Sequence, residues 1–402
     1  MDGNNSMLFA EIVAVTSVFG LGLTMFLLGS IKIRLTESLG IDDAQMGKLF
    51  SVYNFSNLVF VLVAGILLDQ FGYQTIAVIG FIAATIAMFM MGMASSYVLA
   101  IVGCLALGVG SMFMNTAGNT MLGNPQILFD DPGRSGNMGN VFFGLGAFCA
   151  PMLTALFFKK MSFQVSLSVL GLLLLIPLIF AFGGTFPEAQ GTFSFGDAAT
   201  LILQPQIILC ALALMCYIAL EVSMAGWITT YMTSVGASET KASSVLSFFS
   251  IAIMVGRLVT ATVIGAALAG AGLELSGSIG PWFVGGLAVV SAVILFAMKG
   301  ISKEGPATLL VIAIGLLFAP IFPTIAGLMF ARTEQAFHGT GFSLIFAVGL
   351  LGAIFVPAWM GQISSGEGKT IKDSMVVAGG VAVILVVISL IMVFALPQTI
   401  AA

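Results

Sequence analysis

Long apolar stretches alternate with short polar breaks along almost the whole chain. Clusters of charge, glycine and proline divide the sequence into apolar spans of about 20 residues, the length that an α-helix needs to cross a bilayer. Glycine and proline inside these spans are compatible with helix, because both are common in membrane helices. The predicted spans cover residues 9–31, 45–68, 74–94, 97–122, 137–158, 162–184, 206–231, 242–268, 281–298, 306–330, 340–363 and 374–396.

The longest polar break, from Gly184 to Gln204, lies near the middle of the chain. It separates six predicted spans from six, so we expect an all-α membrane protein with twelve transmembrane helices in two six-helix halves. The predicted boundaries are 1–184 for the N-terminal half, 185–205 for a central linker and 206–402 for the C-terminal half.

Two offsets indicate an internal repeat of six helices. A shift of 196 residues places Gly40 on Gly236, and each of these glycines precedes a span. A shift of 206 residues places the GAxxxP segment at Gly146 on the one at Gly352. Parallel repeats around a midplane cavity are the architecture of transporters that rock between inward-open and outward-open states.

Composition excludes several classes of protein. Hydrophobic residues make up 59% of the 402 residues and charged residues 7%, whereas a soluble domain carries about 25% charged residues. Such a chain needs the lipid bilayer as its partner, and it has no basic run to hold a nucleic acid. It also lacks a P-loop, a nucleophile elbow and an HExxH motif. We therefore expect no enzymatic activity, no ATP-driven pumping, no metal site and no cofactor.

The connection between the second and third spans reads GILLDQFGY, residues 65–73. It resembles the signature loop of the major facilitator superfamily, which has a glycine, an aspartate four residues later and a second glycine. Gly65 allows close helix approach, Asp69 ends a helix at the interface and Gly72 permits a tight turn. The resemblance implies the major facilitator fold, with these three residues in a gating loop that closes the cytoplasmic side. Gln70 and other neutral residues replace the usual basic residues of the signature.

Further segments are similar to particular branches of that superfamily. YIALEVSMAGWITTY from Tyr217, the GR pair at 256–257 and APIFPT from Ala319 resemble the fucose permease family. NTAGNT from Asn115 and NVFFGLGAF from Asn140 resemble the sodium-dependent glucose transporter-like relatives. These resemblances imply symport of a sugar or similar polyol with H⁺ or Na⁺. One difference is that sugar/proton members of the fucose branch carry a glutamate in the fourth helix where this chain has Asn115.

Three ionisable residues lie within apolar spans, and charge at that depth marks a functional candidate. Glu11 lies in the first turn of its span, where the headgroup region accounts for it. Glu221 and Arg257 lie deep in consecutive antiparallel spans, offset by roughly 7 Å at 1.5 Å per residue, which an arginine side chain can bridge. We predict that they pair as a coupling site for the driving ion, and a fixed structural salt bridge is the alternative.

Asparagines recur at helical spacing in the N-terminal half, so each pair shares one helical face. Amide groups suit the hydroxyl groups of a sugar because they both donate and accept hydrogen bonds. We predict that the substrate contacts Asn54, Asn57, Asn115, Asn119 and Asn140, and that Trp227 stacks on an apolar sugar face. Asn137 forms a further pair with Asn140. Hydrogen bonding between helices is the alternative for the amides, and anchoring at the membrane interface is the alternative for the tryptophan.

The expected function is secondary active transport of a small polar solute by a monomer with alternating access. An exporter of drugs, lipids or metabolites is the alternative, because 34 Phe and 23 Met suit an adaptable apolar cavity. A receptor or an intramembrane enzyme would need a soluble domain or a catalytic constellation, and the sequence offers neither.

Orientation in the membrane brings two arguments into conflict. The family resemblance implies a multi-pass protein of the cell (inner) membrane. It places both termini and the central linker in the cytoplasm. The outer side then carries Lys32, Arg34, Lys48, Lys159, Lys160, Lys241, Lys299, Lys303, Lys369 and Lys372, and the inner loops carry Arg134 and Arg332. The positive-inside rule predicts the reverse. We give the family resemblance precedence, because its signature loop belongs to the cytoplasmic face.

Overall fold

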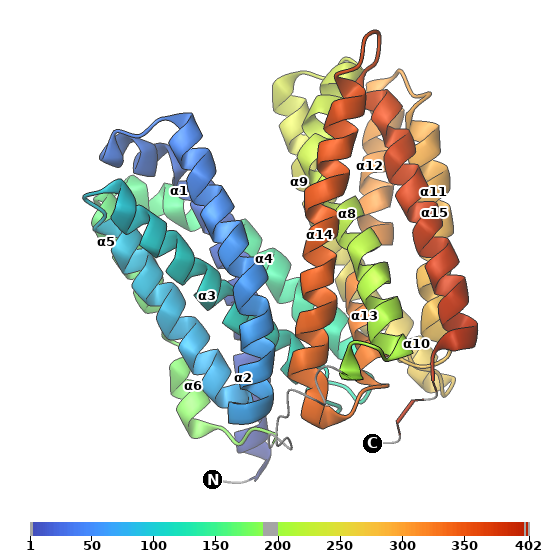
Figure 1. Cartoon of the computed structure of the whole chain (residues 1–402), viewed down its shortest axis with the longest axis horizontal. Helices are drawn as coiled ribbons and strands as arrows, with labels where there is room; N and C mark the ends of the chain where they lie inside the picture. Colours follow the sequence, from blue (N-terminus) through green and yellow to red (C-terminus); the bar gives the residue numbers. More distant parts are fainter. Residues whose placement is uncertain (1–2, 188–199, 398, 401–402) are drawn as a thin grey trace. The chain divides into compact units, whose positions relative to one another are not determined.

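The computed structural model describes residues 3–187, 200–397 and 399–400. The described residues form helices and loops and contain no β-strand (Figure 1). The first helices are α1 (Gly3–Leu39), α2 (Asp43–Gly92), α3 (Tyr97–Leu122), α4 (Pro132–Phe158), α5 (Phe163–Leu173) and α6 (Leu178–Gly183). The others are α8 (Pro205–Ser234), α9 (Glu239–Val259), the π-helix η1 (Thr260–Ile264), α10 (Gly265–Gly270), α11 (Ile279–Met298), α12 (Glu304–Phe318), α13 (Ile321–Phe330), the 3₁₀ helix η2 (Gln335–Phe337), α14 (His338–Ser364) and α15 (Ile371–Ala395).

Eleven helical segments of the described chain are long and apolar enough to cross a membrane. One of them, α2, has 50 residues, enough for about 75 Å of straight helix, which is more than twice the roughly 30 Å of a bilayer's hydrocarbon core. Its backbone leaves the helical conformation at Gly72, where φ is 80° and ψ is 167°. The helix thus makes two crossings, and the prediction of twelve transmembrane segments is confirmed.

Helix α1 differs from its predicted span by continuing to Leu39 instead of ending near residue 31. Its last two turns carry Lys32 and Arg34, so these basic residues lie on a helix and not in a loop. At 37 residues the helix is about 55 Å long, and its charged end therefore extends past the apolar part of the span.

Equivalent helices of the two halves begin in the same way. Gly40 and Gly236 both have left-handed backbones, with φ of 62° and 94°, a conformation that glycine adopts without strain. Each glycine precedes an N-cap that accepts a hydrogen bond from the first turn, Asp42 for α2 and Ser238 for α9. The turn chemistry thus repeats at the offset of 196 residues that the sequence indicates.

Close helix packing repeats as well. A Cβ atom on Gly146 of α4 would overlap the carbonyl oxygen of Phe19 in α1, and one on Gly352 of α14 would overlap that of Met215 in α8. The two glycines differ by 206 positions and the two contacted residues by 196, which are the same two offsets. Only glycine lets the backbones approach this closely, so the repeat is present in the packing as well as in the sequence.

The described residues form two compact units. Unit 1 contains the described residues of 1–130, 142–195 and 335–343, and unit 2 contains those of 131–141, 196–334 and 344–402. Helices α4 and α14 are therefore each divided between the units near their N-terminal ends. The division at the central linker stays a prediction, and residues 188–199 of that linker lie outside the described residues.

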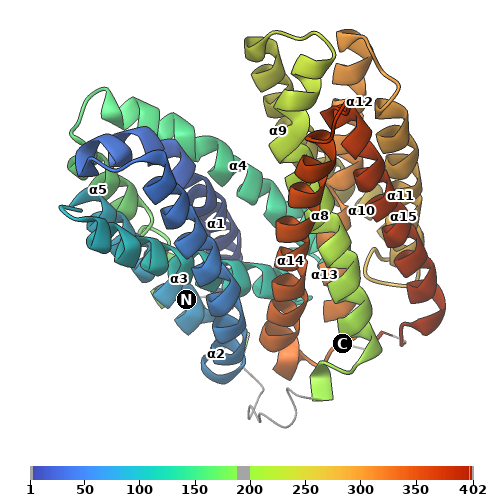
Figure 2. The same ribbon diagram turned by 45° about the horizontal axis from the view of Figure 1, so that its top comes forward.

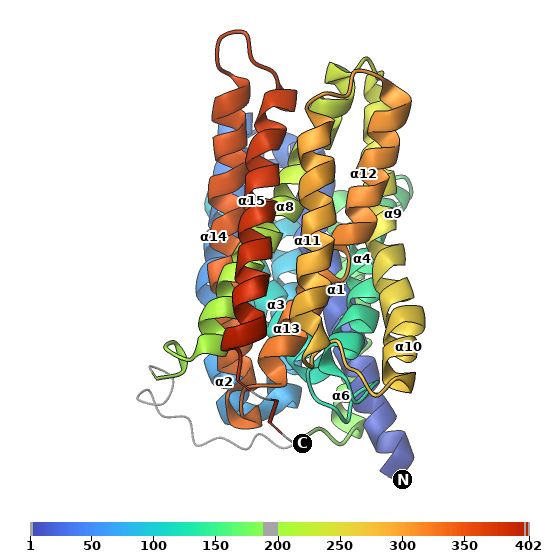
Figure 3. The ribbon, with the colours of Figure 1, turned by 90° about the vertical axis from the view of Figure 1, so that its right-hand side faces the viewer.

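Each unit has its own helix packing. In unit 1, α2 packs against α3 and α5, and α1 packs against α3 and α6. In unit 2, α11 lies along α15 and α9 along α12 (Figures 2 and 3), while α8 contacts α9, α13 and α15. Large apolar side chains on the outward faces are exposed, such as Ile179 at 72% and Phe394 at 85%. In a bilayer these side chains face lipid.

Candidate functional site

Glu221 lies near the middle of α8, the central helix of unit 2. Tyr217 precedes it by one helical turn, and this spacing places both side chains on the same face. The Tyr217 ring is buried and packs edge-on against Phe318, with ring centroids 6.3 Å apart. Its hydroxyl group lies beside the Glu221 carboxylate. The Glu221 side chain keeps 25% of its surface exposed.

Arg257 of α9 completes this cluster in the same unit. Its Nη2 lies 3.7 Å from Glu221 Oε1 and 3.4 Å from the Tyr217 hydroxyl. The side chain is only 3% exposed, and Nη1 donates to the carbonyl oxygen of Asn140 at 3.3 Å. The structure therefore brings together the acid and the base that the sequence pairs, and it adds a buried tyrosine.

A broken helix supplies another acceptor for Arg257. Its Nε donates to the carbonyl oxygen of Ala319 at 3.2 Å, at the break between α12 and α13. In an uninterrupted helix this oxygen would accept from the N–H of residue 323, but Pro323 has none. The guanidinium replaces that missing donor, so Arg257 holds the break as well as facing the carboxylate.

A second irregularity follows directly on α9. Residues Thr260–Ile264 form a π-helix, a distortion that is frequent at functional sites. Nε of Arg134, near the start of α4, donates to the carbonyl oxygen of Ala261 at 2.8 Å. A Cβ atom on Gly265 would lie 2.9 Å from the same arginine side chain. An arginine thus donates to a backbone oxygen in each of these two irregular segments.

The predicted asparagines of unit 1 differ in their surroundings. Asn54 of α2 is exposed, whereas Asn57, Asn115 and Asn119 are buried. Asn119 Nδ2 donates to the backbone oxygen of Asn115 at 3.1 Å and to its Oδ1 at 2.9 Å. The side-chain oxygen of Asn57 has no hydrogen-bond partner within the described part of the chain. Such a buried acceptor calls for an explanation, and a polar ligand is one.

The two asparagines at the start of α4 belong to unit 2. Asn137 Nδ2 donates to Gly133 O at 2.8 Å and Asn140 Nδ2 to Gly136 O at 2.9 Å, each within the same helix. Asn140 also contributes the backbone oxygen that Arg257 binds. The structure thus places Asn140 beside the ionisable pair within unit 2, whereas Asn54, Asn57, Asn115 and Asn119 belong to unit 1.

Trp227 lies on α8, beyond Glu221, and its ring packs on α14. Its indole nitrogen donates to the carbonyl oxygen of Pro357 at 3.2 Å. A Cβ atom on Gly361 would lie 3.1 Å from the indole ring, so the missing side chain makes room for it. The ring orientation is therefore fixed by α14, whether or not a sugar stacks on it.

The predicted gating loop binds the first turn of α14 within unit 1. The Asp69 carboxylate is buried and accepts hydrogen bonds from the N–H groups of Gly339 at 2.8 Å and Thr340 at 2.7 Å. These donors have no partner inside the helix, and the positive end of the helix dipole favours the carboxylate. Gly65 faces the same turn, where a Cβ atom would overlap Gly339 and Ser343. No basic residue is needed for this contact.

Unit 2 contains a related contact that the sequence reasoning missed. Asp131, just before α4, accepts from the N–H groups of Leu275 at 2.7 Å and Ser276 at 3.1 Å. Arg332 donates to the carbonyl oxygens of Ser276 at 2.6 Å and Gly277 at 3.3 Å, and its burial lowers the pKa of the guanidinium. The loop between α10 and α11 is thus held by an acid and a base. The internal repeat could have indicated this contact. Leu275 lies 206 positions after Asp69, at the same offset that relates Gly146 to Gly352, so the loop at Leu275 is the counterpart of the predicted gating loop.

Exposed ion pairs join neighbouring helices, one between α1 and α2 and another between the end of α11 and the start of α15. Lys32 binds Asp43 at 3.0 Å and Lys299 binds Asp373 at 3.3 Å. Side chains this exposed contribute little to stability. No group of three or more histidine, cysteine or acidic side chains within the described residues is arranged to hold a metal ion.

Comparisons with known proteins agree with this architecture. A family model of the Major Facilitator Superfamily matches residues 13–357. The structure is similar to FucP, a transporter of that superfamily solved in the outward conformation, with a TM-score of 0.78 and 14% identity over 96% of this chain and 98% of that one. A second structure of FucP, the fucose:proton symporter of E. coli, gives 0.77 and 15% over 96% and 98%. The proton:xylose symporter XylE, bound to 6-bromo-6-deoxy-D-glucose, gives 0.74 and 11% over 99% and 98%. None of the curated protein sequences matches this chain.

Proposed function

Because the chain belongs to the major facilitator superfamily, whose members are transporters, we propose that it moves a small polar solute, a sugar, by symport with H⁺ or Na⁺. The protein is a multi-pass membrane transporter and not an enzyme. In the proposal it acts as a monomer with alternating access, so that the solute site opens to one side of the membrane at a time.

The observation that carries the proposal is the environment of Glu221. A carboxylate within the membrane is expensive unless it is paired or takes up a cation, and this one has both options. It faces Arg257 at 3.7 Å and remains a quarter exposed. A proton or Na⁺ that binds the carboxylate weakens its attraction to the guanidinium, and departure of the ion restores it. Ion binding is thereby linked to the helices that carry these two residues.

Arg257 connects this exchange to the rest of unit 2. The guanidinium also binds backbone oxygens at the α12–α13 break and in α4. When Glu221 is neutralised, these acceptors still hold the arginine, so the protein stays folded while the pair opens. A small shift of the guanidinium would then move the broken helix, which is the kind of element that shapes binding sites in transporters.

The polarity of the interior favours a sugar over an apolar substrate. Buried side-chain oxygens of Asn57, Asn137, Ser223 and Thr324 have no hydrogen-bond partner among the residues that the structure describes. We assign Asn54, Asn57, Asn115, Asn119 and Asn140 to hydroxyl recognition and Trp227 to stacking on the sugar ring. The similar structures are those of a fucose:proton symporter and a proton:xylose symporter. Export of drugs, lipids or metabolites remains the alternative, and no particular observation favours it.

The gating loop supplies a closing contact in this proposal. Asp69 releases or binds the first turn of α14 as the transporter changes state, with Gly65 allowing the close approach and Gly72 the turn. Hydrogen bonds from a helix N-terminus can hold the carboxylate without a basic partner, which explains how the loop works with neutral residues in place of the family's basic ones.

We further propose that both termini are cytoplasmic in the cell membrane. An even number of crossings places the termini on one side, and ten basic residues then lie on the other. Of the basic residues on the side of the termini, Arg134 and Arg332 donate to backbone oxygens, so both have structural roles there. A reporter enzyme fused after Ala402 should be active in the cytoplasm, and activity only outside the cell would refute this orientation.

Counterflow in proteoliposomes tests the transport reaction. Vesicles preloaded with one unlabelled sugar are diluted into its labelled form, for a panel that includes fucose, xylose and glucose. Labelled sugar should enter transiently for at least one member of the panel, and a gradient of H⁺ or Na⁺ should drive its accumulation. If no sugar exchanges while a lipophilic cation is transported, the exporter is the correct assignment.

The Glu221→Gln variant tests the coupling. It should exchange sugar as the wild type does but should not accumulate it. The neutral glutamine side chain cannot take up a proton, and it offers no negative charge to Na⁺. Glu367→Gln is the matched control, since Glu367 is an exposed acid between α14 and α15. Full accumulation by the Glu221→Gln variant would remove this residue from the mechanism.

A further inference from the structure

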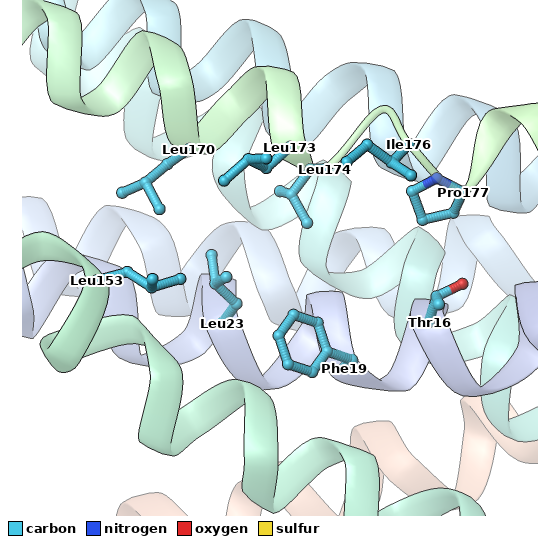
Figure 4. Close-up of a pocket in the computed structure, with 9 residues that line it drawn as sticks. All are labelled: Thr16, Phe19, Leu23, Leu153, Leu170, Leu173, Leu174, Ile176 and Pro177. Atoms are coloured by element: carbon cyan, nitrogen blue, oxygen red, sulfur yellow. The ribbon is translucent and has the colours of Figure 1, made fainter. Parts of the chain in front are cut away.

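A crevice opens in unit 1 between α1, α4 and the α5–α6 pair (Figure 4). It has a volume of about 290 Å³ and is lined by Thr16, Phe19, Leu23, Leu153, Leu170, Leu173, Leu174, Ile176 and Pro177. None of these residues belongs to the transport site proposed above. The crevice therefore needs a separate explanation.

The break between α5 and α6 forms one wall of the crevice. Helix α5 ends at Leu173 and α6 begins at Leu178. Pro177 has no N–H group, and the turn before it makes bonds over three residues, such as Ile176 N–H to Leu173 O at 3.2 Å. This tighter turn shifts the side chains of Leu173 and Ile176 from the positions they would have in a continuous helix. Leu173, Leu174, Ile176 and Pro177 of this turn line the crevice.

The lining cannot bind a polar molecule. Eight of its nine residues are apolar, and the hydroxyl group of Thr16 already donates to Ile12 O of its own helix at 2.6 Å. Apolar cavities of this kind exclude water and accept hydrocarbon ligands. Sugars and ions are therefore excluded as occupants.

Exposed apolar side chains surround the opening of the crevice. Leu173 and Ile176 are 43% and 50% exposed, and Leu172 on the same helix is 54% exposed. In a membrane protein such a surface faces lipid chains. Leu23 and Leu174, by contrast, are both 4% exposed, so the crevice leads from the lipid-facing surface to buried side chains.

We infer that this crevice binds an acyl chain of a bilayer phospholipid. A methylene group is similar in size to a water molecule, whose share of liquid volume is about 30 Å³, so the crevice holds on the order of ten methylene groups. That is a segment of one chain and not a whole lipid. The bilayer supplies such chains at high concentration beside the opening. The inference is independent of the transported solute, since the crevice lies outside the proposed transport site.

Photo-crosslinking with a phosphatidylcholine that carries a diazirine in its acyl chain tests this inference. The protein is reconstituted with this lipid, irradiated and mapped by mass spectrometry. Label should appear at the buried residues Leu23 and Leu174 as well as at exposed Leu172, which serves as the positive control. Label at Leu172 without label at the two buried leucines would overturn the inference.

A filling variant provides the second measurement. Thr16→Phe should lower the label at Leu23 and Leu174 at least fivefold while leaving Leu172 labelled as before. Thr16→Val keeps the size of the side chain and should label like the wild type, because the hydroxyl group takes no part in binding. Unchanged label at Leu23 in folded Thr16→Phe protein would show that the chain does not enter the crevice. The wild-type measurement stands by itself if the filled variant does not fold.

Discussion

Arg257 makes more contacts than Glu221, its partner in the ion pair, so substitutions at the two residues should change stability by different amounts. The arginine donates to the carbonyl oxygens of Ala319 and Asn140 and to the Tyr217 hydroxyl, and its guanidinium also faces the Glu221 carboxylate. The carboxylate is the most distant of the four, at 3.7 Å. Stability should therefore depend on Arg257 much more than on Glu221, although the two residues are paired.

The magnitudes follow from these contacts. Arg257→Lys keeps the charge, but one ammonium group on a shorter side chain cannot replace three separate guanidinium nitrogens. It leaves the oxygen of Ala319 without a donor, because Pro323 has no N–H. A hydrogen bond to a charged group contributes about 1.5–3 kcal/mol, so with partial relaxation we expect a loss of roughly 2–4 kcal/mol. Glu221→Gln keeps an acceptor oxygen at a partly exposed position and should change stability by less than about 1 kcal/mol.

Unfolding by SDS in mixed micelles, followed by tryptophan fluorescence, measures both changes. The double variant closes a double-mutant cycle, and the coupling energy should be below about 1 kcal/mol. If Glu221→Gln proves as destabilising as Arg257→Lys, the pair is a structural salt bridge. Glu221 would then be a fixed structural partner and not an exchangeable carboxylate.

Three further predictions concern the packing and the surface. Gly352→Ala should destabilise unit 2 by about 1–3 kcal/mol, since the added Cβ would overlap a backbone oxygen. Gly286→Ala is its control: a Cβ atom at Gly286 meets nothing within 4 Å, so the thermal midpoint should stay unchanged or rise slightly. Asp69→Asn should cost roughly 1–3 kcal/mol, because one of two N–H groups loses its acceptor, and the exposed Asp130→Asn is its control. Lys299→Met should change stability by less than about 0.5 kcal/mol in the same unfolding assay, since its ion pair is exposed. If Gly352→Ala unfolded at the same midpoint as Gly286→Ala, or Asp69→Asn at the same midpoint as Asp130→Asn, the packing described here would be contradicted.

The sequence by itself determined the class of protein, the number of crossings and the repeat. These properties are local or periodic. The length of an apolar span follows from the thickness of the bilayer, and its ends follow from polar clusters, so twelve spans could be counted without coordinates. Gly40 and Gly236 mark equivalent turns because a left-handed backbone favours glycine wherever it occurs. The depth of Glu221 and Arg257 along their helices could likewise be counted at a fixed rise per residue.

Contacts between distant segments depended on the tertiary structure. The partners of Arg257 include two backbone oxygens, and backbone oxygens carry no signature in a sequence. The Asp69 carboxylate finds its donors 270 and 271 positions later in the chain, and Asp131 finds its donors beyond α10. The lateral rotation of each helix decides whether an asparagine is exposed, as Asn54 is, or buried, as Asn57 is. Helical spacing places both on one helical face but cannot say what each one contacts, because in a membrane the packing of neighbouring helices decides this.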